Sequence, residues 1–295
     1  MTDKRSILSG KWNNERSFPA RNSAARGRAE LTGDHTAKIK TVIFDLDGTL
    51  VRYHGVEFES SWGAIGVAAG VGEEWDRLLA AYINKPLLYS EWMAKSARLL
   101  AGIPLSKVTE KIFPPPYAHG AAAAIKELKG KYQLGILSSG VDLVAERVKT
   151  ELGLDFTVAN RLYISDGHFT GETETVVDLW KKDQVLKQLA TEKNLSLPEV
   201  CFIGDHFNDI AVMGSVGASI AYNPKDERLV EIADMVTTDF REVSKMVEML
   251  AKRSERQEEV CPRKKEDNNE TQNRRAPVCL IGTGRRCTVI VQGRR

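Results

Sequence analysis

The fold of this chain is decided by the stretch Lys40-Thr41-Val42-Ile43-Phe44-Asp45-Leu46-Asp47-Gly48-Thr49-Leu50. Its apolar run, residues 42–44, is typical of a short parallel strand that is buried on both faces. Two carboxylates and a glycine follow the run directly. Asp45 and Asp47 are two positions apart, so on a continuing strand their side chains share one face. Gly48 then lets the backbone turn tightly beside whatever the two carboxylates hold.

The two carboxylates indicate a cation site. Like charges this close require a bound cation or a shared proton. A hard divalent ion such as Mg²⁺ prefers carboxylate and carbonyl oxygens, and it leaves room for a phosphate. The alternative is a strand followed by an ordinary Asp-Gly turn. This motif alone leaves both interpretations open, and the rest of the chain decides between them.

Composition and charge indicate an acidic globular protein between two basic ends. The 295 residues are 42% hydrophobic, which suffices for one large domain or for a core with a smaller module. Residues 1–40 contain nine basic and four acidic residues, and residues 254–295 contain ten and six. Neither end has a sustained apolar period. We therefore expect a flexible extension at residues 1–39 and a disordered basic tail at residues 251–295.

The sequence argues against a nucleic-acid or membrane partner. No aromatic platform accompanies the basic residues of the two ends, so we expect these charges to be solvated. No apolar run approaches the roughly 20 residues of a membrane helix. The four cysteines show neither zinc-ligand nor disulfide-framework spacing, so a reducing cytoplasm is the expected compartment. A homodimer remains open.

Residues 53–117 have the pattern of a small helical module inserted after the first strand. Helices are expected from residue 60 and over residues 73–82, 89–101 and 105–112. The remainder, residues 40–52 and 118–250, alternates between strand and helix patterns. Strands are expected at 132–137, 200–203, 218–222 and 235–237, a hairpin at 163–172, and helices at 118–130, 141–152, 179–193, 210–216, 226–233 and 240–250.

This alternation predicts an α/β fold with a Rossmann-like core of three layers, in which a parallel sheet lies between helices. The helical module would be a cap domain inserted in the core. Three polar clusters, at residues 45–49, 138–140 and 204–209, each follow a predicted strand. The carboxyl ends of parallel strands form one edge of an open sheet, where ligands bind. The three clusters are therefore expected to converge, and the pair Lys181-Lys182 would bring an ammonium to the same edge.

Four motifs occur in order along the chain: Asp-x-Asp-Gly-Thr at 45–49, a serine at 138, a lysine at 181–182, and Gly-Asp-x-x-Asn-Asp at 204–209. Together they resemble those of the haloacid dehalogenase superfamily of phosphatases, and within it the phosphoserine phosphatase type with a helical cap. The resemblance spans about residues 40–250. It implies a Mg²⁺-dependent phosphomonoesterase that acts on a small phosphorylated metabolite through an aspartyl-phosphate.

The resemblance also implies roles for individual residues. Asp45 would be the nucleophile. Asp47 would be the general acid and base, and its backbone carbonyl would join the metal shell. Asp205 would complete the Mg²⁺ site, with Asp209 beside it as a ligand through water or as an orienting group. The implied metal residues are therefore Asp45, Asp47, Asp205 and Asp209.

Five further residues are implied in phosphate binding: Thr49, Ser138, Ser139, Lys182 and Asn208. Lys182 is preferred over Lys181 because it has the family's spacing to the apolar residues that follow. His206 lies inside the metal loop, but Mg²⁺ prefers oxygen ligands, so this histidine is expected to be a bystander.

The substrate side departs from the phosphoserine pattern. His54 lies where the resemblance implies a glutamate that holds the ammonium of the substrate, and Glu57, three residues on, is the candidate substitute. Lys95 lies at the cap position of an arginine that holds the substrate carboxylate. We therefore expect phosphoserine to be a weaker substrate than in a dedicated enzyme, secondary to another small organic phosphate.

Other activities on the same fold are distinguished by single features. A dehalogenase releases halide, which needs no proton, so Asp47 favours phosphoryl transfer. A phosphomutase or phosphotransferase would use the same residues and differ only in what attacks the phospho-enzyme. A phosphonate hydrolase would need a cap lysine that forms a Schiff base, and Lys85 and Lys95 are the candidates. A non-enzymatic binding protein would lack part of the catalytic set, which is complete here.

Overall fold

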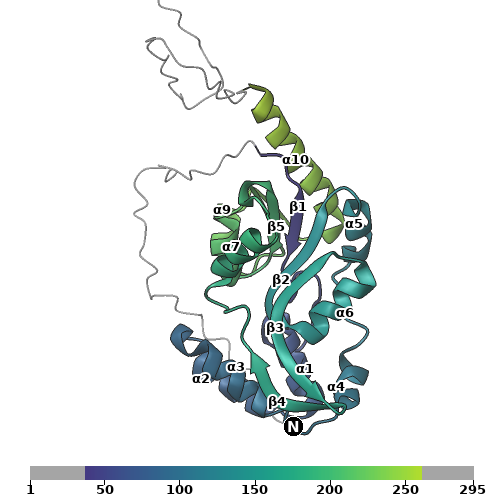
Figure 1. Cartoon of the computed structure of the whole chain (residues 1–295), viewed down its shortest axis with the longest axis vertical. Helices are drawn as coiled ribbons and strands as arrows, with labels where there is room; N and C mark the ends of the chain where they lie inside the picture. The colour runs from purple at the N-terminus through teal and green to yellow at the C-terminus, as the bar shows by residue number, and fades with distance from the viewer. Residues whose placement is uncertain (1–36, 261–295) are drawn as a thin grey trace, which may run out of the picture. The chain divides into compact units, whose positions relative to one another are not determined.

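The computed structural model describes residues 37–260, and its central element is a seven-stranded sheet (Figure 1). Its strand order is β4-β3-β2-β1-β5-β6-β7, parallel throughout except for the antiparallel pair β3 and β4. The expected α/β class is confirmed. Residues 1–36 of the predicted N-terminal extension and most of the predicted basic tail lie outside the described residues. At the end of that extension, Ile39 is buried in the hydrophobic core, so the folded part begins earlier than expected. The strands are β1 (Thr41–Phe44), β2 (Gln133–Val141), β3 (Phe156–Ser165), β4 (His168–Glu174), β5 (Val200–Gly204), β6 (Ala218–Tyr222) and β7 (Met235–Thr237).

β1 lies in the middle of the sheet and is buried on both faces, as its apolar run predicts. Val42 and Phe44 belong to the hydrophobic core on one face, and Ile43 belongs to the core on the other. All three residues are fully buried. Because β1 pairs in parallel with both β2 and β5, the segments that follow these three strands meet at one edge of the sheet.

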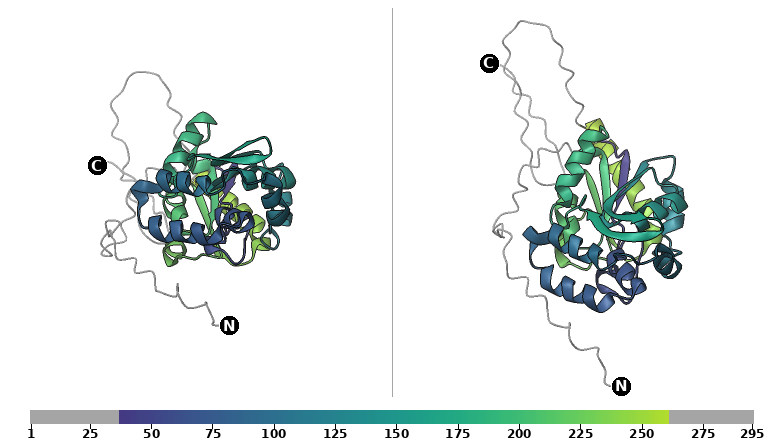
Figure 2. Two further views of the ribbon diagram at one scale, coloured as in Figure 1. Left: turned by 90° about the horizontal axis from the view of Figure 1, so that it is seen from below. Right: turned by 60° about the horizontal axis from the view of Figure 1, so that its bottom comes forward.

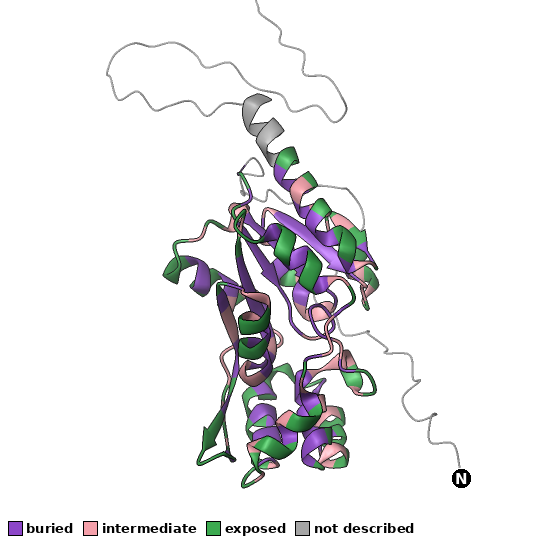
Figure 3. Cartoon of the chain, turned by 90° about the vertical axis from the view of Figure 1, so that its right-hand side faces the viewer, coloured by how far each residue is buried: buried purple, intermediate pink, exposed green. Residues whose placement is uncertain are grey.

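Helices cover both faces of the sheet (Figure 1). On one face lie α5 (Ala121–Leu128), α6 (Asp142–Leu152) and α10 (Val243–Val260). On the other lie α7 (Lys182–Glu192), α8 (Ile210–Met213) and α9 (Glu227–Ile232). Figure 3 shows the buried strands in purple, with green, exposed surface on the outer sides of the helices. The closing helix, α10, is longer than expected, since it ends at Val260 and not at residue 250.

Four of the five α-helices between β1 and β2 lie together at one end of the sheet, and we call them the cap helices (Figures 1 and 2). They are α1 (Ser61–Ala69), α2 (Gly72–Tyr82), α3 (Tyr89–Arg98) and α4 (Leu105–Ile112), at the places that the sequence predicts. The two ends of this inserted segment run side by side. The Arg52 amide donates to the Pro116 carbonyl at 2.8 Å, and the Ala118 amide donates to the Leu50 carbonyl at 2.9 Å.

The hairpin of β3 and β4 joins the sheet to the cap helices. Asp166 and Gly167, both at positive φ, form its turn. Phe169 on β4 is 1% exposed, and its backbone exchanges hydrogen bonds with the loop after α3, through the Gly102 amide at 2.9 Å and the Ile103 carbonyl at 3.0 Å. The hairpin is longer than expected, because β3 begins at residue 156 as a parallel strand beside β2 before it turns outward.

The serine cluster lies within β2 and not in a loop after it. β2 runs to residue 141, and its pairing with β3 shifts register between residues 137 and 141. This irregularity turns residues 138–140 out of the regular ladder at the carboxyl end of the sheet. Among residues 37–260, no helix is both long enough and apolar enough to span a membrane.

Candidate active site

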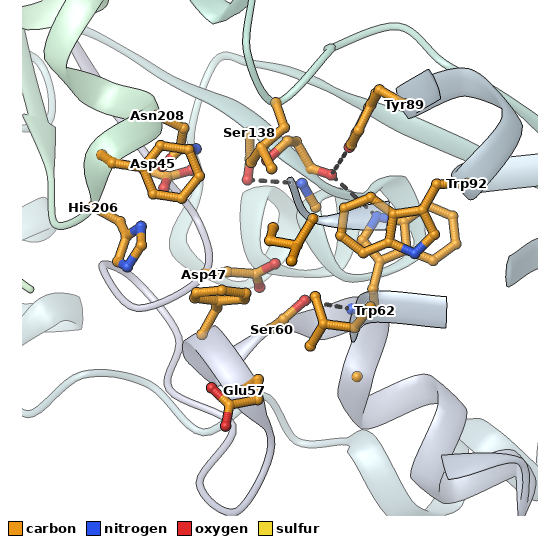
Figure 4. A pocket seen from close by; sticks show the side chains of 18 of the residues that line it. Asp45, Asp47, Glu57, Ser60, Trp62, Tyr89, Trp92, Ser138, His206 and Asn208 are labelled. Carbon is orange, nitrogen blue, oxygen red and sulfur yellow. Dashed lines mark hydrogen bonds between the residues drawn. The ribbon is translucent and has the colours of Figure 1, made fainter. Parts of the chain in front are cut away.

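A cavity of about 100 Å³ lies between the carboxyl edge of the sheet and the cap helices (Figure 4). The sheet contributes acidic groups from the segments after β1 and β5 and hydroxyl groups from the carboxyl end of β2. The cap contributes mainly aromatic and aliphatic side chains. The lining residues on the sheet side are Asp45, Asp47, Ser138, Ser139, Gly140, Asp205, His206, Phe207 and Asn208.

Lys182 connects two of the predicted acidic residues. It is the first residue of α7, its side chain is fully buried, and its Nζ lies 2.9 Å from Asp45 Oδ1 and 2.6 Å from Asp209 Oδ1. Burial alone would lower the pKa of this ammonium, but the two carboxylates outweigh burial and raise the pKa. The neighbouring Lys181 is 52% exposed and pairs with Asp178 at 3.5 Å. Lys182 is therefore the lysine that reaches the acidic cluster.

Asp205 and Asp209 hold the loop after β5 in place. Asp209 Oδ2 accepts hydrogen bonds from the Asp205 amide at 3.0 Å and the His206 amide at 3.2 Å. Asp205 Oδ1 accepts from Thr49 Oγ1 at 3.0 Å, and its Oδ2 pairs with Lys225 Nζ at 2.8 Å. Thr49 thus orients Asp205 and does not line the cavity.

The three carboxylates fit a hard divalent cation. Asp45, Asp205 and Asp209 are all buried, and each can offer an oxygen within 4.8 Å of the others. Burial raises the pKa of both Asp205 and Asp209, a shift that nearby cations oppose. A bound cation would favour the ionised carboxylates in the same way. Asp47 contributes no side-chain oxygen to this group.

Gly48 is required by the close approach of this loop to Asp205. Its φ is +80°, in the left-handed region that glycine tolerates. A Cβ at this position would lie 2.2 Å from Asp205 Oδ2. The glycine after the two aspartates therefore allows the β1 loop to pack directly against the Asp205 carboxylate.

Asp47 lies at the cavity with one oxygen fixed and the other without a partner. Its Oδ2 accepts from Ser61 Oγ at 2.8 Å, and its Oδ1 is buried with no hydrogen-bond partner among the described residues. Burial raises the pKa of Asp47 to about 7, and the Ser61 hydrogen bond opposes the shift. Such a carboxyl group exchanges a proton near neutral pH.

Comparison with known proteins identifies the family. The family model of the haloacid dehalogenase-like hydrolases matches residues 42–214. The chain belongs to this family. The phosphoserine phosphatase of Methanocaldococcus jannaschii is 32% identical over 214 residues, which cover 71% of this chain and 98% of that protein. The phosphoserine phosphatase of Lactococcus lactis is 29% identical over 218 residues, which cover 73% and 97%.

A solved structure gives the same result as the sequences. The structure described as a phospho-aspartyl intermediate analogue of phosphoserine phosphatase matches with a TM-score of 0.59 at 32% identity, and the match covers 71% of this chain and 99% of that one. The resemblance inferred from the four ordered motifs is therefore confirmed. The fold of this hydrolase is that of the family.

The remaining residues of the predicted phosphate site lie at the cavity. Ser138 is 1% exposed, and its Oγ accepts from the Gly140 amide at 3.1 Å. The Ser139 carbonyl accepts from Trp62 Nε1 at 3.1 Å and from Asn160 Nδ2 at 2.8 Å, which ties the serine segment to a cap helix and to β3. Asn208 lies beside Asp45 (Figure 4).

Three residues of the site were missed by the sequence analysis: Ser61, Asn160 and Lys225. Ser61 falls at the start of a predicted helix, and that position alone does not indicate its hydrogen bond to Asp47. Lys225 follows the carboxyl end of β6. Ligands bind at the carboxyl ends of parallel strands, so the argument that predicted the three polar clusters applies to Lys225 as well. Asn160 gave no signal, because a single asparagine within a strand pattern does not indicate which backbone groups it will satisfy.

The substrate side differs from what the resemblance implies. His54 is 74% exposed, does not line the cavity, and lies 3.3 Å from Glu59. Lys95 is 48% exposed and pairs with Glu91 at 2.8 Å, also away from the cavity. Glu57 does line the cavity. Burial lowers the pKa of His206 to about 4, so this ring is neutral at pH 7.

Proposed function

We propose that this protein is a Mg²⁺-dependent phosphomonoesterase that hydrolyses a small organic phosphate through an aspartyl-phosphate on Asp45. One observation carries the proposal: a buried lysine and three buried carboxylates meet beside a cavity that Asp45 and Asp205 line. Its relatives are named phosphoserine phosphatases, and the matched structure is described as a phospho-aspartyl intermediate analogue.

The contacts of Asp45 suit it for nucleophilic attack. Its Oδ1 accepts from the Leu46 amide at 2.7 Å and pairs with Lys182, so Oδ2 is the oxygen left to attack phosphorus. The ester P–O bond breaks as the new bond forms, and the departing alkoxide takes the proton of Asp47. The ionised Asp47 then takes a proton from water, which attacks phosphorus and releases phosphate and Asp45.

Mg²⁺ would be held by the Asp45, Asp205 and Asp209 carboxylates, with Asp47 contributing its backbone carbonyl. When bound, the ion offsets phosphate charge that would otherwise repel the nucleophile. Lys182 holds Asp45 in position and adds a second positive charge. Ser138, Ser139 and Asn208 supply hydrogen bonds to the phosphoryl oxygens in this proposal, and Thr49 acts through Asp205.

We assign residues 53–117 to a cap domain and residues 40–52 and 118–250 to the core. The cap would cover the cavity and exclude water from the reacting groups. A phosphonate hydrolase is disfavoured, because neither Lys85 nor Lys95 is among the described residues that line the cavity. The cytoplasmic location and the homodimer stay predictions, which fractionation and size-exclusion chromatography would check.

The test is phosphate release from a panel of small phosphomonoesters, with the full chain. We expect turnover in Mg²⁺, loss of turnover in excess EDTA, and recovery when Mg²⁺ is added back. Asp45→Asn should abolish turnover. Asp183→Asn is the control, because this aspartate lies one residue after Lys182 but pairs outward with Lys187. Full activity of Asp45→Asn, or full activity in EDTA, contradicts the proposal.

A further inference from the structure

The part of the cavity beyond the phosphate site is aromatic and contains no cationic side chain. Among the described residues that line it, none is lysine or arginine. Trp62 and Trp75 stack at 5.7 Å, and Trp92 meets the Tyr89 ring edge-on at 5.9 Å. In Figure 4 the labelled Trp62, Tyr89 and Trp92 gather on one side of the cavity, and Asp45, His206 and Asn208 lie on the other. The leaving group of a bound ester would lie against these rings.

The one charged side chain on this part of the lining is Glu57. Glu57 is exposed at the rim and makes no ion pair within residues 37–253. Glu59, by contrast, has two cationic partners: it accepts hydrogen bonds from Arg52 Nη2 at 2.9 Å and from Lys225 Nζ at 2.8 Å. Glu57 therefore offers an uncompensated negative charge to whatever enters the cavity.

The turn that carries Glu57 is held in an uncommon conformation. Phe58 has φ of 59° and Glu59 has φ of 51°, both in the left-handed region that side chains rarely adopt. Glu59 is fixed by Arg52 and Lys225, and the Phe58 ring contacts the His206 ring edge-on at 5.1 Å. Strain of this kind persists where surrounding contacts hold it, and it clusters at ligand sites. Because of this turn conformation, Glu57 and Phe58 both line the cavity.

We propose that the cavity selects phosphate esters of small amino alcohols, in which the alcohol carries an ammonium or quaternary ammonium group and no carboxylate. The electron-rich faces of the aromatic residues receive the cation, as aromatic rings do for quaternary ammonium ligands, and Glu57 supplies negative charge at the rim. This inference rests on the proposed phosphatase function and names its substrate class.

An anionic substituent on the alcohol would be poorly received in this cavity. A carboxylate taken out of water needs a cationic partner, and the described residues on the cap side of the lining include no lysine or arginine. Trp92 Nε1 is buried without a hydrogen-bond partner among the described residues, but a single neutral donor does not balance a full charge. Phosphoserine carries both an ammonium and a carboxylate, so its carboxylate should lower its turnover.

Two matched pairs of substrates test this with the full chain in Mg²⁺. Phosphocholine and 3,3-dimethylbutyl phosphate have the same shape and differ in the positive charge. Phosphoethanolamine and L-phosphoserine differ only in the carboxylate. We expect kcat/KM to be at least about tenfold higher for phosphocholine than for its neutral analogue. We also expect phosphoethanolamine to exceed L-phosphoserine by a similar factor.

The variant Glu57→Gln assigns the effect to the rim. The ratio of kcat/KM for phosphocholine to kcat/KM for 3,3-dimethylbutyl phosphate should fall by roughly two- to fivefold, which is the effect expected of a partly exposed charge pair. Asp76→Asn makes the same charge change on the exposed side of α2, and its ratio should equal that of the wild type. Equal turnover of the charged and neutral esters, or L-phosphoserine as the best substrate, overturns this inference and leaves the phosphatase proposal standing. No turnover of any ester overturns both.

Discussion

Replacing Lys182 by methionine would remove the charge that holds the acidic cluster together. Methionine keeps the length of the side chain but leaves Asp45 and Asp209 without the ammonium that lies 2.9 and 2.6 Å from their Oδ1 atoms. Breaking a buried ion pair by removing one partner costs about 3–5 kcal/mol of stability. At this chain size about 1 kcal/mol corresponds to roughly 2–4 °C, so we expect the Tm to fall by roughly 6–20 °C.

The loss should depend on the divalent cation. A bound ion places positive charge beside the same carboxylates, so Lys182→Met should lose more stability in EDTA than in saturating Mg²⁺. Calorimetry of both proteins in both buffers measures this difference. Lys181→Met is the matched control: it changes the adjacent lysine, which is 52% exposed, and should stay within about 0.5 kcal/mol of the wild type. Equal effects of the two substitutions would refute the assignment of Lys182 to the cluster.

Three further substitutions probe the surroundings of this cluster. In Gly140→Ala the new Cβ would lie 2.6 Å from Asp47 Oδ2 and would displace this carboxyl group. Because a displaced Asp47 transfers its proton less well, kcat should fall by roughly tenfold or more. A wild-type kcat would show that the position of Asp47 does not matter. Ser61→Ala removes the 2.8 Å hydrogen bond from Ser61 Oγ to Asp47. The free energy of unfolding, measured with denaturant, should fall by about 1–3 kcal/mol. An unchanged unfolding midpoint would contradict this expectation. Burial alone would raise the pKa of Glu59, but Arg52 and Lys225 hold it below its ordinary value. Its carboxylate therefore stabilises the fold above the unfolded pKa of about 4.3, and this contribution is lost as the pH falls through the folded pKa. The Tm difference between wild type and Glu59→Gln should be largest near pH 7 and shrink toward pH 3, whereas a difference independent of pH would mean that the charge of Glu59 does not matter.

Several parts of the site were predictable because they follow from local sequence and from the geometry of parallel sheets. Residues 42–44 are apolar without interruption, which indicates a strand buried on both faces, and β1 is one. Polar residues after neighbouring parallel strands must meet at one edge, so the approach of Asp45 to Asp205 needed no tertiary detail. The inserted helices were recognisable from their period and their bounding turns.

Other parts were not predictable, because they depend on how separate elements pack. His54 occupies the predicted substrate position in the sequence, yet it is exposed to solvent beside Glu59. Glu57, in the turn at residues 57–59, lines the cavity instead. Lys225 contacts Asp205, 20 positions away, and Glu59, 166 positions away, and so joins the two carboxylates. No local pattern encodes a contact of that kind.

What the sequence alone determined was the class of fold, the order of the motifs and the acidic edge where they converge, because strand burial and parallel connection are read from neighbouring residues. The tertiary structure decided which lysine is buried, which hydroxyl holds Asp47 and which side chains face the leaving group. These depend on the cap helices and on the hairpin that contacts them. Aromatic residues at helical spacing pack in any helical module, so the sequence could not distinguish rings of the core from rings that line a cavity. That distinction requires the position of α1, α2 and α3 relative to the sheet, which long-range packing sets.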